Sequence, residues 1–201
     1  MKLKYAIALT GGIAVGKSSA MSFMSMYGFR CIDADKIAHD ILDEQRDKIA
    51  SMFGNEVLST NGVNRAELGK IVFADANKRK DLESLLHPLI YDKIMALAQV
   101  EEKRKFPYFI DIPLFFENER YDIDKSLVVY APKDLQIQRL MKRNSLSYED
   151  AMQRINSQMD IEEKKLKATY IIDNTKDIKH LQNECEKVRG IILEDFKEGG
   201  I

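Results

Sequence analysis

Short runs of apolar residues alternate along the chain with longer segments in which apolar residues recur every three or four positions. The short runs predict buried β-strands, because a strand covered on both faces is apolar throughout, and the recurring pattern predicts amphipathic helices. The expected strands are residues 4–9, 29–32, 106–112, 126–131 and 170–173. Such alternation is typical of an α/β fold, here a parallel sheet of about five strands flanked by helices.

The helical segments between these strands divide the chain further. The expected helices are residues 20–27, 37–42, 65–73, 78–101, 144–168 and 179–196, with one more around Arg139. Pro88 interrupts the 78–101 pattern and predicts a kink or a fresh helix start. Asn61-Gly62 predicts a turn. The resulting division is a core of residues 1–55, 102–138 and 169–201, a helical insertion at 56–101 and a polar helical flap at 139–168.

Composition narrows the class of protein only slightly. The 201 residues are 45% hydrophobic and 31% charged, which suits one compact globular domain with a sizeable core. The formal net charge of -1 argues against a general nucleic-acid or membrane surface. Because no signal-peptide pattern and no run of about 18 apolar residues occurs, we expect a cytoplasmic protein. Cys31 and Cys185 fit no metal-binding spacing and are expected to be buried thiols.

One stretch between the first strand and the first helix carries the clearest chemistry. Gly11 to Ser18 fits the phosphate-loop pattern G-x-x-x-x-G-K-[ST], in the strand–loop–helix context that the pattern requires. Glycines let backbone N–H groups converge on phosphates, and the helix start adds unbonded donors and a favourable dipole. Lys17 would reach the β- and γ-phosphates and Ser18 would bind Mg²⁺. The candidate nucleotide-binding residues are Gly11, Gly12, Ile13, Ala14, Val15, Gly16, Lys17, Ser18 and Ser19.

Carboxylates follow two of the predicted strands. Asp33 and Asp35 come directly after the second strand, and ligands of open α/β sheets bind outside the carboxyl ends of the strands. Either acid could instead cap the following helix, and one residue can do both. Asp111 ends the 106–112 run, at a position that resembles a Walker B acid. It could hold Mg²⁺ through water, position the phosphate loop, or satisfy loop amides.

Three other groups of residues are candidates with open alternatives. His87 sits at the Pro88 interruption, where its ring could face a ligand or serve the structure. Arg139 and Arg143 are four residues apart, so their guanidinium groups share a helix face and can hold phosphate oxygens. The flap adds Arg154, Gln158, Lys164, Lys165 and Lys167. For most of its lysines a solvated charged face is the simpler interpretation.

A phosphate loop serves both phosphotransfer enzymes and nucleotide-dependent switches, and the sequence separates the two. Switch GTPases carry D-x-x-G and N-K-x-D motifs, but no D-x-x-G occurs here and Asn174-Thr175-Lys176-Asp177 is only a near match to the second. A short chain with a helical insertion and an arginine-bearing flap instead indicates a small kinase. The phosphate loop alone leaves nucleoside-monophosphate, shikimate and gluconate kinases open as alternatives.

Further motifs, in the same order and spacing, resemble the dephospho-CoA kinase family over nearly the whole chain. They are Thr10-Gly11-Gly12-Ile13-x-x-Gly16-Lys17-Ser18, Ile32-Asp33-Ala34-Asp35, His87-Pro88-Leu89-Ile90, Pro113-Leu114-Phe115-Phe116-Glu117 and Ile172-Asp173-Asn174. The resemblance implies a P-loop kinase fold and phosphorylation of the 3′-hydroxyl of dephospho-CoA with ATP and Mg²⁺. It also implies dephospho-CoA as the small-molecule substrate. The near-neutral charge already predicts no nucleic-acid or membrane partner, and we expect a monomer.

The resemblance assigns roles to individual residues. Catalysis would fall to Asp33, beside the attacking hydroxyl, with Lys17 and Arg139 on the phosphates. The implied ATP contacts add Arg143 in the lid, residues 139–168, and Asn174 near the adenine. The implied acceptor contacts are Asp33, His87, Pro113, Leu114 and Glu117. His87 falls within residues 56–101, the implied acceptor-binding insertion. The candidate metal ligands are Ser18, Asp33 and Asp111.

The chain departs from the family pattern at two places. The family's loop often reads Gly-Ile-Gly-Ser-Gly-Lys-Ser, whereas Ala14 and Val15 stand here in place of its middle Gly-Ser. We therefore expect residue 14 to avoid a positive φ, which disfavours side chains with a Cβ. Thr169 stands where the family tends to have an acid after alanine.

Overall fold

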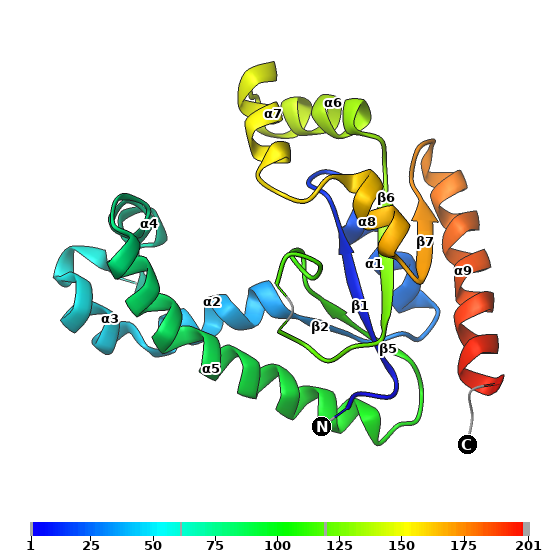
Figure 1. The fold of residues 1–201 in the computed structure, drawn as a ribbon, viewed down its shortest axis with the longest axis horizontal. Helices are drawn as coiled ribbons and strands as arrows, with labels where there is room; N and C mark the ends of the chain where they lie inside the picture. The colour runs from blue at the N-terminus through cyan, green and yellow to red at the C-terminus, as the bar shows by residue number, and fades with distance from the viewer. Residues whose placement is uncertain (1, 61, 119, 199–201) are drawn as a thin grey trace. The chain divides into compact units, whose positions relative to one another are not determined.

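The computed structural model describes residues 2–60, 62–118 and 120–198. The chain divides into two compact units. We call Met1–Ile32 with Val100–Ile201 the sheet unit and Asp33–Gln99 the helical unit. Both units appear in Figure 1.

The sheet unit is built on five parallel strands in the order β2-β5-β1-β6-β7. Their bounds are β1 Ala6–Gly11, β2 Cys31–Asp33, β5 Tyr108–Asp111, β6 Lys125–Tyr130 and β7 Tyr170–Asp173. The predicted α/β class and number of strands in this sheet are confirmed. The first strand starts two residues later than predicted, because the amides of Lys4 and Tyr5 bind the Glu102 carboxylate, at 2.9 Å each, instead of a neighbouring strand.

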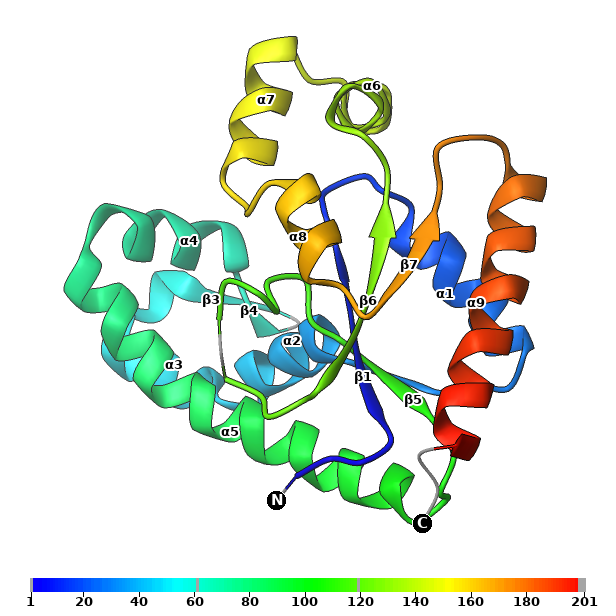
Figure 2. The same cartoon turned by 45° about the vertical axis from the view of Figure 1, so that its right-hand side comes forward.

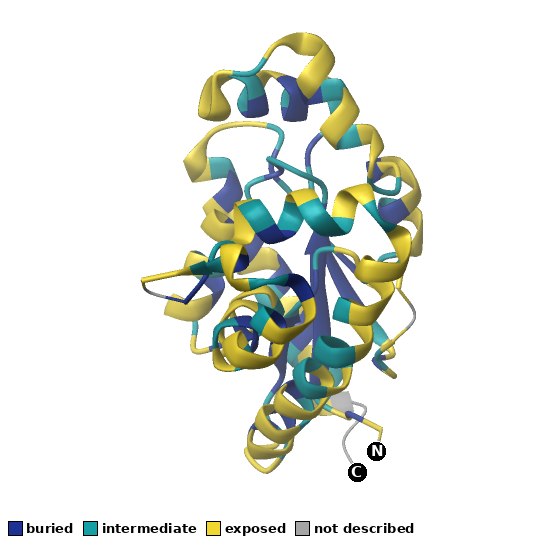
Figure 3. Cartoon of the chain, turned by 90° about the vertical axis from the view of Figure 1, so that its left-hand side faces the viewer, coloured by how far each residue is buried: buried dark blue, intermediate teal, exposed yellow. Residues whose placement is uncertain are grey.

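Helices cover both faces of this sheet, which is why its central strands are mainly apolar. The helices of the unit are α1 Lys17–Met26, α6 Lys133–Asn144, α7 Tyr148–Asn156, α8 Ile161–Lys167 and α9 Ile178–Glu198. α9 packs on α1 and β7, while α8 contacts β6, the strand beside the central β1 (Figure 2). All six residues of β1 are buried, and the strands form the buried layer in Figure 3.

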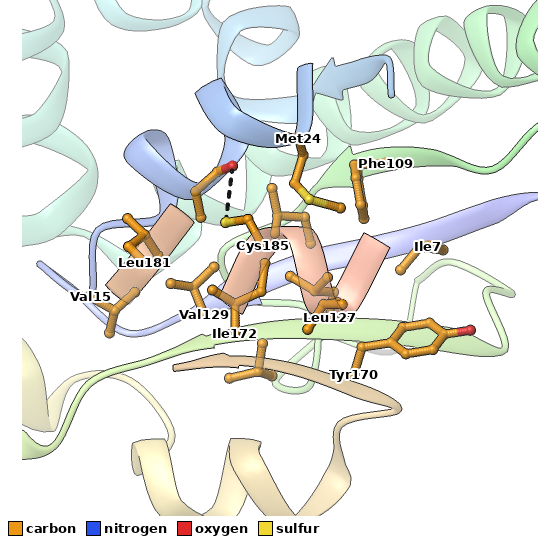
Figure 4. Packing of buried hydrophobic residues seen from close by; sticks show 14 of the residues in the cluster. Ile7, Val15, Met24, Phe109, Leu127, Val129, Tyr170, Ile172, Leu181 and Cys185 are labelled. Carbon is orange, nitrogen blue, oxygen red and sulfur yellow. Dashed lines mark hydrogen bonds between the residues drawn. The ribbon is translucent and has the colours of Figure 1, made fainter. Parts of the chain in front are cut away.

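The two cysteines lie in different surroundings. Cys185 of α9 is buried among Leu127, Val129 and Ile172, and its thiol lies 3.9 Å from the Ala20 carbonyl (Figure 4). Burial raises the pKa of Cys185 to about 11, so it stays an unreactive thiol near neutral pH. Cys31 in β2 is only half-buried, so the prediction that both thiols are buried is wrong for Cys31.

The predicted flap is divided by helix caps. Ser147 caps α7 by accepting a hydrogen bond from the Asp150 amide at 3.1 Å, and Asp160 caps α8 by accepting one from the Glu162 amide at 2.8 Å. α6 and α7 share a small apolar core of their own, centred on Ile137, Leu140 and Ala151. Residues 139–168 therefore contain the end of one helix and two further helices, rather than the single helical stretch predicted for 144–168.

The helical unit is built around its own apolar cluster. Its elements are α2 Ala34–Glu44, α3 Arg46–Phe53, the 3-10 turn η1 Asn55–Val57, β3 Leu58–Ser59, β4 Gly62–Val63, α4 Arg65–Ala74 and most of α5 Ala76–Glu102. The cluster contains Leu42, Ile49, Phe53, Val57, Val63 and Leu68. Asp43 fixes the hairpin by accepting hydrogen bonds from the Val63 amide and from Arg65, at 2.9 Å each.

The structure of this unit differs from the sequence prediction in two respects. The small antiparallel pair β3–β4 and the helix α3 were not predicted, because their elements are short and lack a clear apolar period. Asn61 of the predicted turn lies outside the described residues. The alternative that a new helix starts at Pro88 is wrong, because α5 continues without a break through this proline. Before Pro88, the α5 residues Leu82, Leu85 and Leu86 pack on the apolar cluster.

None of the helices within the described residues has the length and apolar character needed to span a bilayer.

A buried carboxylate ties the last turn of α5 to Arg30, the residue before β2. Glu101 accepts hydrogen bonds from Arg30 Nη1 at 3.1 Å and from Arg104 Nη1 at 2.7 Å. Burial raises the pKa of Glu101, but the two guanidinium groups outweigh it and hold the pKa below its ordinary value of 4.5. The ionised carboxylate therefore favours the folded state at neutral pH.

We predict that Glu101→Gln lowers the free energy of unfolding by about 1–3 kcal/mol at neutral pH, because it removes charge-assisted hydrogen bonds. A depressed folded-state pKa adds stability above the unfolded pKa, and this stability is lost as the pH falls below 4.5 through the folded pKa. Urea unfolding at about pH 7 and about pH 3 should therefore show the difference between variant and parent shrinking at the lower pH. An equal difference at both pH values would contradict the assignment.

Candidate active site

The phosphate loop, which we call the donor loop, joins β1 to α1 through residues Gly11 to Ser18. Gly16 is the N-cap residue of α1 with φ 90°, and no side chain caps this helix. The first amides of α1 are therefore left to bind an anion, with the positive end of the helix dipole behind them. A Cβ at residue 16 would collide with the Asn174 side-chain amide, so only glycine fits this turn.

The loop needs a second positive φ, at Ala14. Ala14 has φ 60°, a left-handed conformation that costs a residue with a Cβ roughly 1–2 kcal/mol. The expectation that residue 14 avoids a positive φ is therefore wrong. The physical reason is that the contacts around the loop outweigh the intrinsic preference of alanine for a negative φ and bear the strain.

Some of these contacts act on the Val15 carbonyl. The side-chain amide of Asn174, just beyond β7, donates to it at 2.7 Å, and Arg139 Nη1 of α6 donates at 3.4 Å. Arg139 Nη2 also donates to the Asn174 carbonyl at 2.9 Å. Arg139 and Asn174, which are 35 residues apart in the sequence, thus both donate hydrogen bonds to the same loop carbonyl. The adenine contact proposed for Asn174 stays a prediction.

A second contact, from Lys164 of α8, was missed in the sequence. Its side chain is 0% exposed, and Nζ lies 3.2 Å from the Gly11 carbonyl, 3.1 Å from the Pro113 carbonyl and 2.9 Å from Glu117 Oε1. The solvated-face interpretation is therefore wrong for this lysine. A signal was present: Lys164 lies three residues after buried Ile161 and four before half-buried Ala168, on the inward face of the helix.

Lys17, the first residue of α1, forms an ion pair with Asp111 at the end of β5. Both side chains are about four-fifths buried, at 19% and 20% exposure. The pairing holds the Lys17 ammonium beside the loop. Ser18, next to it, is exposed.

This neighbourhood suits a magnesium ion bound mainly by a nucleotide. Hydroxyl and carboxylate oxygens are ligands that Mg²⁺ prefers, and Ser18 and Asp111 supply one of each. Among the residues described, no three acidic, histidine or cysteine side chains cluster as an all-protein metal site. That fits an ion held through one or two side chains plus substrate phosphates.

A pocket of about 360 Å³ opens beside the donor loop. Arg139 and Arg143, predicted to share a helix face, both line it. The other lining residues are Ala14, Gly16, Ser19, Asn174, Lys176, Asp177, Ile178 and Leu181. The cavity beside the loop thus has two guanidinium groups and an apolar wall. These suit the charged phosphates and the planar base of a nucleotide.

A second pocket, of about 310 Å³, lies against Gly12 and the helices of the flap. Gln136 on its wall is buried, and its amide nitrogen donates to the Ala131 carbonyl at 2.9 Å. A Cβ at Gly12 would come within 2.5 Å of Gln136 Oε1, so a larger residue would have to displace the end of the Gln136 side chain.

Two predicted site residues belong to the helical unit. Asp33 is the N-cap of α2, and its Oδ1 accepts a hydrogen bond from the Lys36 amide at 2.8 Å. The capping alternative is therefore observed, which leaves its other oxygen and a catalytic role open. His87 is a half-buried residue within α5, directly before Pro88.

Comparisons with known proteins decide the family. A family model described as dephospho-CoA kinase matches residues 5–180. The chain belongs to the dephospho-CoA kinase family. A curated dephospho-CoA kinase from Sulfurimonas denitrificans is 53% identical over 187 residues, covering 93% of this chain and 94% of the relative. One from Helicobacter pylori is 46% identical over 196 residues, covering 96% and 100%. A solved dephospho-CoA kinase from Campylobacter jejuni has a TM-score of 0.70 at 39% identity, covering 94% and 98%.

The dephospho-CoA kinase motif Pro113 to Glu117 is directed partly into the protein. The Pro113 carbonyl accepts hydrogen bonds from Thr10 Oγ1 at 2.9 Å and from Lys164, whereas Leu114 is exposed. Glu117 Oε1 accepts from Lys164 and from the Met159 amide at 3.0 Å. Its Oε2 is buried and has no hydrogen-bond partner among the described residues. The acceptor role implied for this motif stays a prediction.

The departure from the dephospho-CoA kinase pattern at Thr169 has a structural basis. Thr169 Oγ1 accepts from the Ser126 amide at 3.0 Å, and the Thr169 amide donates to Ser126 Oγ at 3.3 Å. The two side chains thus join the starts of the paired strands β6 and β7. A hydroxyl at residue 169 performs this local pairing.

We predict that Ala14→Gly does not lower the free energy of unfolding and raises it by up to about 1 kcal/mol, because relief of the left-handed strain offsets the added chain entropy. Ala168→Gly is the matched control, since Ala168 is also half-buried but has φ -73°. It should lose about 0.5–1 kcal/mol in the same denaturant titration. Equal losses in both variants would show that residue 14 carries no strain.

Proposed function

We propose that the chain transfers the γ-phosphoryl group of ATP to the ribose 3′-hydroxyl of dephospho-CoA, giving coenzyme A and ADP. The observation that carries the proposal is the donor loop, with its uncapped helix start and Lys17, in a chain that matches the dephospho-CoA kinase family from residue 5 to residue 180. A cytoplasmic location and a monomeric state remain predictions from the sequence.

The donor half of the reaction rests on charge. Lys17 exchanges its Asp111 partner for the β- and γ-phosphates, and the first amides of α1 bind phosphate oxygens. Arg139 keeps the loop in shape and, with Arg143, faces the nucleotide pocket. Mg²⁺, when bound, would neutralise charge on the transferring group, and Ser18 and Asp111 would hold it. These groups stabilise the charge that develops in the transition state.

The acceptor half rests on Asp33 and the segments that the family resemblance assigns to dephospho-CoA. Asp33 would accept or orient the proton of the 3′-hydroxyl. His87, Pro113, Leu114 and Glu117 would contact the acceptor. Closure of residues 139–168 would exclude water from the site, which suppresses hydrolysis of ATP.

We predict that Lys17→Met lowers kcat/KM for dephospho-CoA phosphorylation by about 10²–10³-fold, because it removes a cation from the transferring phosphates. Met keeps most of the length of the side chain. The measurement is ADP release coupled to a dehydrogenase, with dephospho-CoA, nucleoside monophosphates and small polyols offered separately. Lys197→Met, an exposed lysine in the last turn of α9, is the control. Turnover of a monophosphate or polyol, with dephospho-CoA ignored, would favour the alternative kinases.

We predict that Asp33→Asn lowers kcat by about 10²–10⁴-fold, since asparagine cannot take up the hydroxyl proton. Asparagine caps a helix about as well as aspartate, so the melting temperature should stay unchanged. Asp40→Asn removes an exposed carboxylate from the same helix and serves as the control. Wild-type turnover by Asp33→Asn would remove Asp33 from the mechanism.

A further inference from the structure

Asn174, directly after β7, is a polar residue held inside the protein at 7% exposure. Its backbone amide donates to the Tyr130 carbonyl at 2.8 Å, and its backbone carbonyl accepts from Arg139 at 2.9 Å. Its side-chain nitrogen donates to the Val15 carbonyl at 2.7 Å. Burial of a polar side chain is costly unless it is hydrogen-bonded. These bonds therefore fix Asn174 between the end of β6 and the donor loop.

The Asn174 side chain also lies against the turn that begins α1. A Cβ added at Gly16 would collide with Asn174 Nδ2, so the side-chain amide occupies the space over the α-carbon of this glycine. Gly16 has φ 90° and ψ 26°, a left-handed conformation that glycine adopts at no steric cost. The same freedom gives glycine many other conformations, so a turn built on it needs contacts that hold it in this one.

The conformation of Gly16 sets the direction of the first amides of α1. A left-handed residue next to a right-handed one turns successive N–H groups toward one concave side, which forms an anion site. Gly16 and Lys17, the first helical residue, are such a pair, so the amides of residues 16–18 share that side. The intrahelical hydrogen bonds begin with the Ser19 amide, which donates to the Gly16 carbonyl at 3.1 Å. The three amides before it are the ones available to an anion.

The first of these amides belongs to the peptide that Asn174 holds. The Val15 carbonyl and the Gly16 N–H lie in one peptide plane, and within the described residues no peptide bond is cis. In a trans peptide the two groups point in opposite directions. Asn174 and Arg139 hold the carbonyl on their side, at 2.7 Å and 3.4 Å, so the Gly16 N–H points away from both of them. Asn174 thereby fixes the peptide that opens the concave site.

The sequence around Asn174 suggests a different role from the one that its contacts show. Asn174-Thr175-Lys176-Asp177 is a near match to the N-K-x-D motif with which switch GTPases read guanine. In the structure its asparagine bonds the donor loop, and Oδ1 of its aspartate accepts from the His180 amide at 2.8 Å in the first turn of α9. The asparagine nitrogen is thus directed to the backbone of the loop.

We propose that Asn174 is a positioning residue for the triphosphate: by holding the Val15 carbonyl, it keeps the Gly16 turn in the conformation that gathers the first amides of α1 on the phosphates. The effect acts on the phosphate chain, so it is the same for every base. Gly16 and Asn174 both line the nucleotide pocket, where the donor is expected. The inference rests on the proposed function only for its turnover measurement, because donor binding can be followed without an acceptor.

The central variant is Asn174→Ala, which removes the hydrogen bond to Val15. Calorimetry without acceptor should show Mg-ATP, Mg-GTP and magnesium tripolyphosphate, which has no base, all binding about tenfold more weakly than to the wild type. The ratio of ATP affinity to GTP affinity should stay unchanged. With dephospho-CoA present, kcat should fall by about tenfold or more. Thr175→Ala is the matched control, since it removes a hydroxyl bonded to Asp173 in the same turn and should keep wild-type affinities.

The pattern of losses separates positioning of the loop from recognition of the base. Weaker ATP binding with unchanged GTP and tripolyphosphate binding would assign the Asn174 side chain to adenine and overturn the proposal. Wild-type affinity for all three ligands in Asn174→Ala would also overturn it, as would an equal loss in Thr175→Ala. If the wild type binds the three ligands and Asn174→Ala weakens them alike, but neither protein uses dephospho-CoA, the proposed function fails and the role of Asn174 stands.

Nuclear magnetic resonance tests the contact in the unaltered protein and so does not depend on the folding of a variant. The sequence contains one Val–Gly bond, Val15–Gly16, so valine labelled with ¹³C at the carbonyl and glycine labelled with ¹⁵N isolate the Gly16 amide. Mg-ATP and tripolyphosphate should both shift its signal downfield. With ¹⁵N-labelled asparagine, the scalar coupling across the hydrogen bond from Asn174 Nδ2 to the Val15 carbonyl should persist when Mg-ATP binds. Loss of this coupling on binding would contradict the positioning role.

Discussion

A loop that turns its amides toward an anion must turn its carbonyls toward something else. Each buried carbonyl without a partner costs free energy, so a phosphate loop is stable only when donors surround its outer side. In this chain, Lys164 binds the Gly11 carbonyl, and Asn174 and Arg139 bind the Val15 carbonyl. The strain of Ala14 lies between these two anchored peptides, where the contacts on either side can bear it.

This requirement explains the course of the chain after β6. Arg139, Lys164 and Asn174 come from α6, from α8 and from the end of β7, and all three reach a loop more than 120 residues earlier in the sequence. The parallel sheet makes this possible, because β1 pairs with β6, β6 pairs with β7, and parallel neighbours end on the same edge. Hydrogen-bond donors on the segments that follow β6 and β7 therefore lie beside the donor loop.

The sequence predicted those features that neighbouring residues determine, and missed those that depend on contacts between distant residues. The strands, the donor loop and the pairing of Arg139 with Arg143 on one face follow from neighbouring residues and were found. The buried state of Lys164 depends on Gly11, Pro113 and Glu117, which are 47 or more residues away, so its charge alone indicated a solvated position. The left-handed conformation of Ala14 was mispredicted for a related reason. Alanine prefers a negative φ, and contacts from residues distant in the sequence override this preference.

The same contacts limit how the predicted lid can move. Arg139 is the first residue of the 139–168 segment and Lys164 lies near its end, and both are bonded to the donor loop. Between them, α7 packs on α6 through Ala151, Ile137 and Leu140, while the α7–α8 linker is held through the Met159 amide on Glu117. A closing motion that kept the loop intact would therefore have to take place between these anchors, in α7 and its two connections. The ends of the lid would then shape the phosphate site, and its middle would cover the site.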